Sequence, residues 1–147
     1  MRRLFALLAP LAALVAASPA LALDYRSVIE AAPLYDAPSA KSTPLFVVLA
    51  GTPVELVVSL EGWSKVRDSK GDLAWIEKSH LTEKRNVIVR AERAQVRAAA
   101  DDKAALVFEA ERDVVLELSE AAPGGWARVK HRDGPGGFLK TTQVWGL

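Results

Sequence analysis

Short hydrophobic runs separated by turn-forming segments follow one another along most of the chain. Residues 54–58 (Val-Glu-Leu-Val-Val) and residues 114–118 (Val-Val-Leu-Glu-Leu) are two such runs, each rich in residues that favour strands. Gly, Pro, Asp and Ser fill the segments between runs, at 50–53, 68–72, 123–125 and 132–137. Helix formers are common in 98–110, but the apolar residues there are not spaced for one helix face. The pattern predicts an all-β protein of short strands, as in a small barrel or sandwich.

The hydrophobic pattern occurs twice. Residues 62–67 (Gly-Trp-Ser-Lys-Val-Arg) recur as residues 125–130 (Gly-Trp-Ala-Arg-Val-Lys), and the same offset continues downstream without gaps. Upstream, after a small change in loop length, residues 34–38 roughly match residues 95–99. An internal period of about 60 residues indicates two copies of one small domain, because solenoid units are shorter.

The repeat also sets the expected domain boundaries. We expect the first copy over 26–83, a polar hinge at 84–85 and the second copy over 86–147. A barrel of about 60 residues without disulfides buries too little surface to be more than marginally stable alone. We therefore expect the two copies to pack against each other.

The first 22 residues have the pattern of a signal peptide. Arg2 and Arg3 precede an apolar run from 4 to 17, and the small residues of the 20–22 triplet (Ala-Leu-Ala) suit cleavage after Ala22. The run is short for a transmembrane helix, which needs about 20 residues, although an uncleaved anchor is the alternative. No second long apolar run follows, so no membrane span is expected after cleavage.

Composition narrows the function classes. Among 147 residues, 19 Lys and Arg balance 18 Asp and Glu, and this near-neutral charge argues against a nucleic-acid partner. The absence of cysteine excludes disulfides, thiolate metal sites and a cysteine nucleophile. Export without cysteine favours a periplasmic location in a bacterium over a eukaryotic secreted domain.

Catalytic motifs are missing from the sequence. The chain contains no G-x-S-x-G, H-E-x-x-H or P-loop pattern, and its two histidines, His80 and His131, have no second ligand at metal spacing. The acidic residues of 101–113 form no pair with contrasting environments. We therefore expect neither an enzyme nor a bound cofactor or metal.

The repeated G-W-x-[KR]-V motif, followed by a glycine turn and an aromatic strand, resembles the bacterial SH3-like domains of exported and envelope proteins. In the first copy the matching segments are 34–39, 49–51, 62–66, Gly71, 74–76 and Leu81. In the second copy they are 96–98, 125–129, Gly134, 137–139 and Val144. Ala74 stands where the family pattern has glycine, and the second copy lacks the Pro-Ser loop. The resemblance implies two tandem SH3-like β-barrels over 28–147, and a cell-wall peptide as the partner.

Strand alternation selects the candidate ligand-binding residues, because Val66 and Val129 should point into the cores. The outward residues are Trp63, Lys65, Arg67 and Trp75 in the first copy, extended by Tyr35, and Trp126, Arg128, Lys130 and Phe138 in the second. The turn lengths predict that Trp63 lies opposite Trp75 and that Trp126 lies opposite Phe138. These aromatic side chains either stabilise the hairpins or, beside their cations, form a surface that binds a carboxylate-bearing ligand.

Two functions remain open at this stage. The first is non-enzymatic binding of a cell-wall peptide or peptidoglycan-derived ligand in the bacterial envelope. The second is a structural or adaptor role in contact with another envelope protein, which requires a flatter apolar patch such as Val57 with Phe46 or Val48. Trp145 near the C-terminus is a further binding candidate, with packing across the last turn as its alternative.

Overall fold

The computed structural model describes residues 23–122 and 124–147, so the expected signal peptide lies outside the described residues. The first half forms seven strands: β1 (Tyr25–Val28), β2 (Ala32–Tyr35), β3 (Pro44–Val48), β4 (Pro53–Ser59), β5 (Trp63–Arg67), β6 (Leu73–Glu77) and β7 (Leu81–Thr82). The second half forms β8 (Asn86–Val89), β9 (Arg93–Arg97), β10 (Leu106–Glu111), β11 (Val115–Ala122), β12 (Trp126–Lys130), β13 (Gly136–Lys140) and β14 (Val144–Trp145). Two single-turn 3-10 helices, η1 (Lys78–His80) and η2 (Thr141–Gln143), precede β7 and β14.

Each half is one antiparallel sheet, which we call barrel 1 (β1–β7) and barrel 2 (β8–β14). The strand order is β3-β2-β6-β5-β4-β1-β7 in barrel 1 and β10-β9-β13-β12-β11-β8-β14 in barrel 2, so the two halves have the same topology. In each barrel the last strand pairs with the first: β7 lies against β1, and β14 lies against β8. The prediction of an all-β fold built from two copies of one small domain is confirmed.

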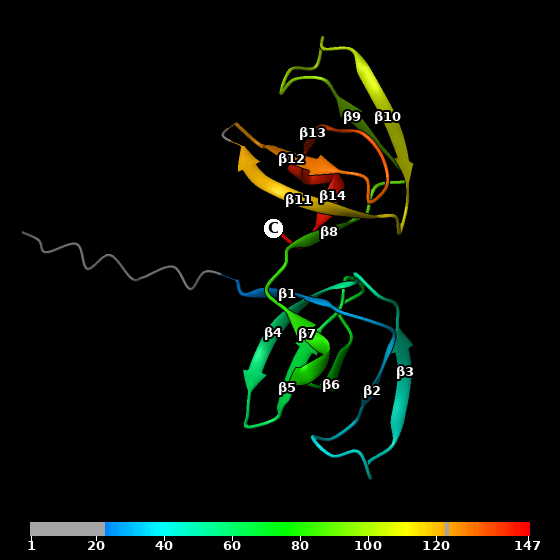
Figure 1. The fold of residues 1–147 in the computed structure, drawn as a ribbon, viewed down its shortest axis with the longest axis vertical. Helices are drawn as coiled ribbons and strands as arrows, with labels where there is room; N and C mark the ends of the chain where they lie inside the picture. The colour runs from blue at the N-terminus through cyan, green and yellow to red at the C-terminus, as the bar shows by residue number, and fades with distance from the viewer. Residues whose placement is uncertain (1–22, 123) are drawn as a thin grey trace, which may run out of the picture.

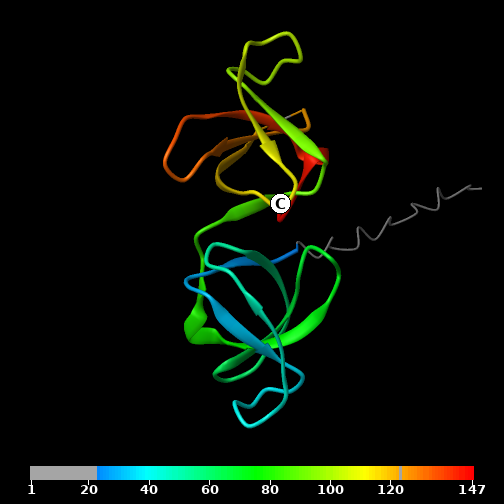
Figure 2. The same cartoon turned by 90° about the vertical axis from the view of Figure 1, so that its right-hand side faces the viewer.

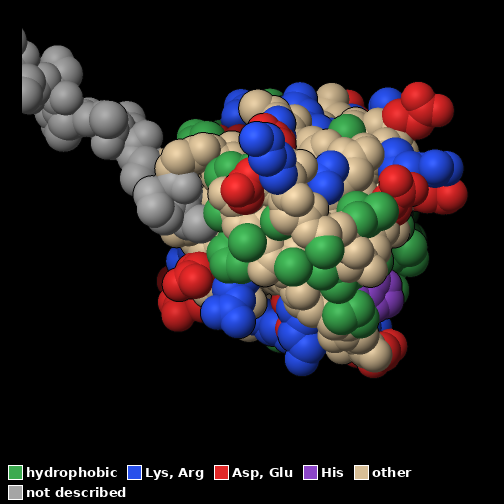
Figure 3. Space-filling model, turned by 90° about the horizontal axis from the view of Figure 1, so that it is seen from above, with side chains coloured by type: hydrophobic (Ala, Val, Ile, Leu, Met, Phe, Trp, Pro, Cys, Tyr) green, Lys and Arg blue, Asp and Glu red, His purple; other side chains and the backbone are tan. Residues whose placement is uncertain are grey.

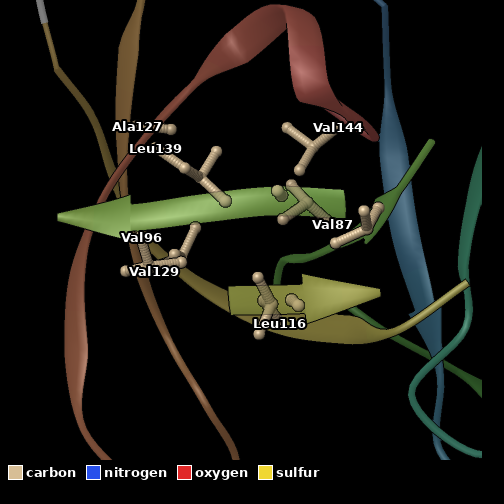
Figure 4. Packing of buried hydrophobic residues seen from close by; sticks show 10 residues of the cluster. Val87, Val96, Leu116, Ala127, Val129, Leu139 and Val144 are labelled. Carbon is tan, nitrogen blue, oxygen red and sulfur yellow. The ribbon is translucent and has the colours of Figure 1, made fainter. Parts of the chain in front are cut away.

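The two barrels have separate hydrophobic cores. The core of barrel 1 consists of Val28, Ala32, Leu34, Val48, Val54, Val66, Ala74 and Ile76. The core of barrel 2 consists of Val87, Val89, Ala94, Val96, Ala110, Leu116, Ala127, Val129, Leu139 and Val144, most of which are labelled in Figure 4. These side chains come from alternate positions of successive strands, as the two-residue period of a strand requires.

A β-bulge interrupts the alternation in β4. Leu56 pairs with Val66, whereas Val58 pairs with Lys65, so Val57 is the extra residue. Val57 and the residue that follows it, Val58, are both about two-fifths exposed. Strand β11 carries the same irregularity between Leu118 and Glu120.

The barrels stack end to end along the long axis, joined by the short segment between β7 and β8 (Figures 1 and 2). The Asn86 side-chain amide donates a hydrogen bond to the Gly51 carbonyl oxygen at 2.8 Å, across the junction. The ring of Tyr25 in β1 meets the ring of Trp145 in β14 edge to face, with centroids 5.2 Å apart. Arg85 lies over the same tyrosine ring, 5.2 Å from its centroid. The two copies therefore pack against each other.

Among the described residues, no helix has the length and hydropathy needed to cross a membrane.

Candidate functional site

Three aromatic residues meet on the outer face of barrel 1. Tyr35 on β2 pairs across the strands with Trp75 on β6, and the ring of Trp63 on β5 contacts the Tyr35 ring edge to face, with centroids 5.6 Å apart. The alternate positions Ser64 and Val66 are buried, as the strand period predicts. Tyr35, Trp63 and Trp75 are each half-buried, so they form a partly exposed surface that we call the aromatic face.

The predicted cross-strand pairs are wrong by two residues. Trp63 lies opposite Glu77, and Trp75 lies opposite Lys65. The hairpin turn is longer than predicted, because the Asp68 carboxylate accepts hydrogen bonds from the backbone amides of Lys70 and Asp72, both at 2.9 Å. In barrel 2 the same shift places Trp126 opposite Lys140 and Phe138 opposite Arg128.

The two cations predicted for the aromatic face have different roles. Arg67 forms a salt bridge with Glu55 on the neighbouring strand, at 2.8 Å, so its charge is already paired. Lys65 forms no salt bridge among the described residues, and it lies beside Trp75 in the register of β5 and β6. Of the two cations, Lys65 is therefore the one without a salt-bridge partner among the described residues.

The corresponding face of barrel 2 combines two aromatic residues, Trp126 and Phe138, with neighbouring cations. Phe138 pairs with Arg97, just as Trp75 pairs with Tyr35 in barrel 1, so Arg97 is the structural counterpart of Tyr35. The match between the two sequence copies had aligned Tyr35 with Val96, which is buried. The Arg128 guanidinium lies 6.0 Å from the Phe138 ring centroid, and the Lys140 amine lies 5.9 Å from the Trp126 ring centroid.

These cations are close to acidic side chains of the same barrel. The Lys140 amine is 2.8 Å from the Asp102 carboxylate, and Arg128 is 3.9 Å from Glu120. Lys130 is exposed and, with Arg128 and Phe138, lines a hollow of about 290 Å³. From the barrel 2 end, charged side chains of both signs surround a band of hydrophobic ones (Figure 3). Trp126 and Phe138 therefore each lie next to a cation of the same barrel.

The apolar patch expected for an adaptor lies elsewhere on barrel 1. Val48 is buried and Phe46 packs against the core, so neither joins Val57 in a surface patch. The alternate residues of the same segment face outward: Leu45, Val47 and Leu49 are 50%, 63% and 71% exposed. They belong to or directly follow β3, which is an edge strand of the sheet.

The junction between the barrels contains a cleft to which no sequence motif points. Its volume is about 610 Å³, and its lining includes Ser27, Lys84, Asn86, Glu117 and Arg132. Lys84 donates a hydrogen bond to Glu117 at 2.8 Å, and this bond lowers the pKa of the Glu117 carboxyl. No pattern within one copy could indicate this cleft, because both copies contribute to its walls.

Two further observations concern a titratable group at the junction and the question of a metal site. Trp145 packs against Tyr25 of the other barrel, and burial raises the pKa of the Tyr25 phenol. Within 23–122 and 124–147, no group of three His, Asp or Glu side chains is placed to hold a metal ion.

Comparison with known proteins gives the following matches. The family described as bacterial SH3 domain matches the chain twice, at residues 29–83 and 90–146. The solved structures that are similar to this chain include NlpC2 from Trichomonas vaginalis, with a TM-score of 0.40 and 12% sequence identity. The match covers 86% of this chain and 49% of the NlpC2 chain. Another is an NlpC/P60 family protein from Bacillus cereus (TM-score 0.38, 16% identity, covering 82% of this chain and 55% of that one). The chain thus spans about half the length of these structures. No curated protein matches the chain.

Proposed function

Because the chain belongs to the bacterial SH3 domain family, with two such domains in tandem, we propose that it is an exported, non-enzymatic binding module for a cell-wall peptide or another peptidoglycan-derived ligand. In this proposal residues 1–22 are a cleaved signal peptide, and the mature protein acts in the periplasm. Its two domains are 26–83 and 86–147, joined by the hinge at 84–85.

The observation that carries the proposal is the aromatic face of barrel 1. Tyr35, Trp63 and Trp75 form a partly exposed surface, and Lys65 next to Trp75 has no acidic partner among the described residues. Tyrosine and tryptophan offer large contact areas at low conformational cost, and a free ammonium group attracts a carboxylate. A peptide with an acidic group and an apolar stem fits this combination.

Barrel 2 is the natural internal control for this proposal. Its Trp126 occupies the position of Trp63 but lies beneath the Lys140 amine rather than against a second ring. We therefore assign the principal ligand contact to barrel 1. Arg128, Lys130 and Phe138 remain candidates for a weaker, electrostatic contribution.

Sedimentation with purified peptidoglycan sacculi tests the proposal. We expect the wild-type protein to sediment with sacculi at low salt, and Trp63→Ala to weaken this binding about tenfold or more, as loss of an aromatic hot spot does. The matched variant Trp126→Ala should retain most of the binding. Thermal unfolding of both variants checks that the loss does not come from misfolding. Wild-type protein that stays in the supernatant at low salt would overturn the cell-wall assignment.

The exposed row on β3 favours a second candidate function, an adaptor for another envelope protein. Leu45, Val47 and Leu49 present three large apolar side chains along a sheet edge, and such an edge can pair with a strand of a partner. A photo-crosslinking residue placed at position 47 tests this candidate in cells. A discrete crosslinked protein supports it, and an absence of crosslinks at 47 with efficient crosslinking at position 63 argues for the ligand-binding role alone.

A further inference from the structure

The cleft between the barrels is a site separate from the aromatic face. Its walls come from β1 and the loop before β4 on one side, and from β8, β11 and the turn after β12 on the other. A volume of about 610 Å³ lies within the range of pockets that hold small ligands. Val28, Ile29, Ala50 and Val115 give the cleft an apolar part of moderate size.

Two polar side chains that line the cleft are buried and incompletely hydrogen-bonded. Ser27 is 1% exposed and Asn86 is 7% exposed, and both border the cleft. The Ser27 hydroxyl oxygen and the Asn86 side-chain oxygen have no hydrogen-bond partner among the described residues. Buried polar groups nearly always form hydrogen bonds in folded proteins. Two buried oxygen atoms without hydrogen-bond partners at the same cleft therefore indicate a place where a ligand binds.

The hydrogen bond from Asn86 to Gly51 fixes what that partner has to be. Because the amide nitrogen of Asn86 donates to the Gly51 carbonyl, its side-chain oxygen is an acceptor that needs a donor. The Ser27 hydroxyl can donate or accept. A peptide ligand supplies both kinds of group, a backbone N–H for the Asn86 oxygen and a carbonyl oxygen for the Ser27 hydroxyl.

The charged residues at the rim define the ends of the ligand. Lys84 and Glu117 are paired with each other, so they add little net charge. Arg132 and Asp133 are exposed, line the cleft and form no salt bridge among the described residues. A guanidinium group binds a carboxylate in a bidentate manner, and an aspartate binds an ammonium group. Neighbouring free charges of both signs suit a zwitterion.

We propose that the cleft between the two barrels binds a short peptide with free ends, whose peptide group pairs with Asn86 and Ser27 and whose carboxylate pairs with Arg132. Small aliphatic side chains of the peptide lie against Ile29 and Val115, since Val28 is buried in the core of barrel 1. Reaching the two buried oxygen atoms requires the barrels to move slightly apart at the segment that joins them. The site is independent of the aromatic face, since it shares no residue with it.

Titration of the ¹⁵N-labelled protein with the tripeptide Ala-Ala-Ala tests the proposal. We expect amide chemical-shift changes that gather at Ser27, Gly51, Asn86 and Val115. Amidation of the peptide carboxylate, or the variant Arg132→Gln, should weaken binding about tenfold, since a charge-assisted hydrogen bond is lost. The matched variant Arg112→Gln, an exposed arginine outside the cleft, should leave binding unchanged.

The variant Ser27→Ala separates a ligand contact from a structural role. Because its hydroxyl has no partner in the free protein, its removal should leave the thermal midpoint unchanged or raise it, while peptide binding weakens about fivefold. Ser64→Ala, which removes another buried serine of barrel 1 outside the cleft, is the control for binding. Unchanged affinity in Ser27→Ala, shift changes confined to Tyr35 and Trp63, or no shift changes at about 10 mM peptide would each overturn the proposal.

Discussion

Barrels 1 and 2 have the same strand order and buried residues at corresponding positions, yet their outer faces differ in chemistry. Tyr35 of barrel 1 corresponds to Arg97 of barrel 2, since Tyr35 pairs with the aromatic residue of β6 and Arg97 pairs with the aromatic residue of β13. Glu77 likewise corresponds to Lys140, opposite the two Gly-Trp tryptophans. Inward positions are restricted by packing, whereas outward positions can change without affecting the fold. The comparison shows that the same architecture can carry outer faces of different chemistry.

Among the inward positions at which the two barrels differ, one difference has a geometric cause. A Cβ atom added at Gly137 would lie 2.5 Å from the Arg97 carbonyl oxygen and 2.8 Å from a methyl group of Val96. Barrel 1 has Ala74 at the corresponding position and buries it almost completely. Strands β2 and β6 therefore leave room for a methyl group that strands β9 and β13 do not.

Truncation of one core residue in each barrel should have the largest effect and tests whether the barrels unfold together. Ile76 and Leu139 are corresponding residues with no exposed surface. We expect Ile76→Ala and Leu139→Ala each to lower the free energy of unfolding by about 2–5 kcal/mol, measured by chemical denaturation. Because the barrels pack together, each variant should shift one common transition. Two transitions, of which each variant shifts only one, would show that the barrels are independent.

Substitutions at Gly137 and at the corresponding Ala74 should have the second largest effect on the free energy of unfolding. Gly137→Ala should destabilise the protein by about 1–3 kcal/mol, because the new methyl group forces a backbone carbonyl to move. The reciprocal variant Ala74→Gly should cost only about 0.5–1 kcal/mol, from the extra freedom of the unfolded chain. Both values come from the same denaturation experiment. Equal costs in the two variants would mean that the spacing of the strands does not differ between the barrels.

A third and smaller effect concerns Tyr25, for which barrel 2 has Asn86 at the corresponding place in β8. Burial raises the pKa of the Tyr25 phenol, so the folded state holds the proton more tightly than the unfolded state. The resulting stabilisation is complete below about pH 10 and is lost as the pH rises through the folded-state pKa. The thermal midpoint of the wild type should therefore fall more steeply above about pH 10 than that of Tyr25→Phe. Parallel pH profiles would contradict this.

Most of the fold follows from local features of the sequence. The alternation around each Gly-Trp correctly predicted that Ser64, Val66, Ala127 and Val129 point inward, because one buried valine fixes the direction of a whole strand. Strand β10 was not predicted, since its Leu-Val-Phe-Glu-Ala-Glu sequence follows an alanine-rich segment without a clear strand pattern. The register was wrong because it depends on side-chain hydrogen bonds in the turn, such as those of Asp68.

The candidate sites were predictable only in part. The outward direction of Trp63 and Trp75 follows from strand alternation, but the contact between Trp63 and Tyr35 depends on β6 lying between β5 and β2. The pairing of Arg67 with Glu55 also depends on register. The cleft depends on how the two barrels are placed relative to each other, which no pattern within a single copy encodes.

The pairing of the first and last strands in each barrel has a consequence for how such proteins grow. Ser27 of β1 lies opposite Thr82 of β7. The chain therefore enters and leaves barrel 1 at neighbouring points. A unit of this kind can be inserted or multiplied as a single cassette, because the neighbouring chain has no gap to span. Longer arrays built from the same unit are therefore accessible through simple gene duplication, with new recognition surfaces added one unit at a time.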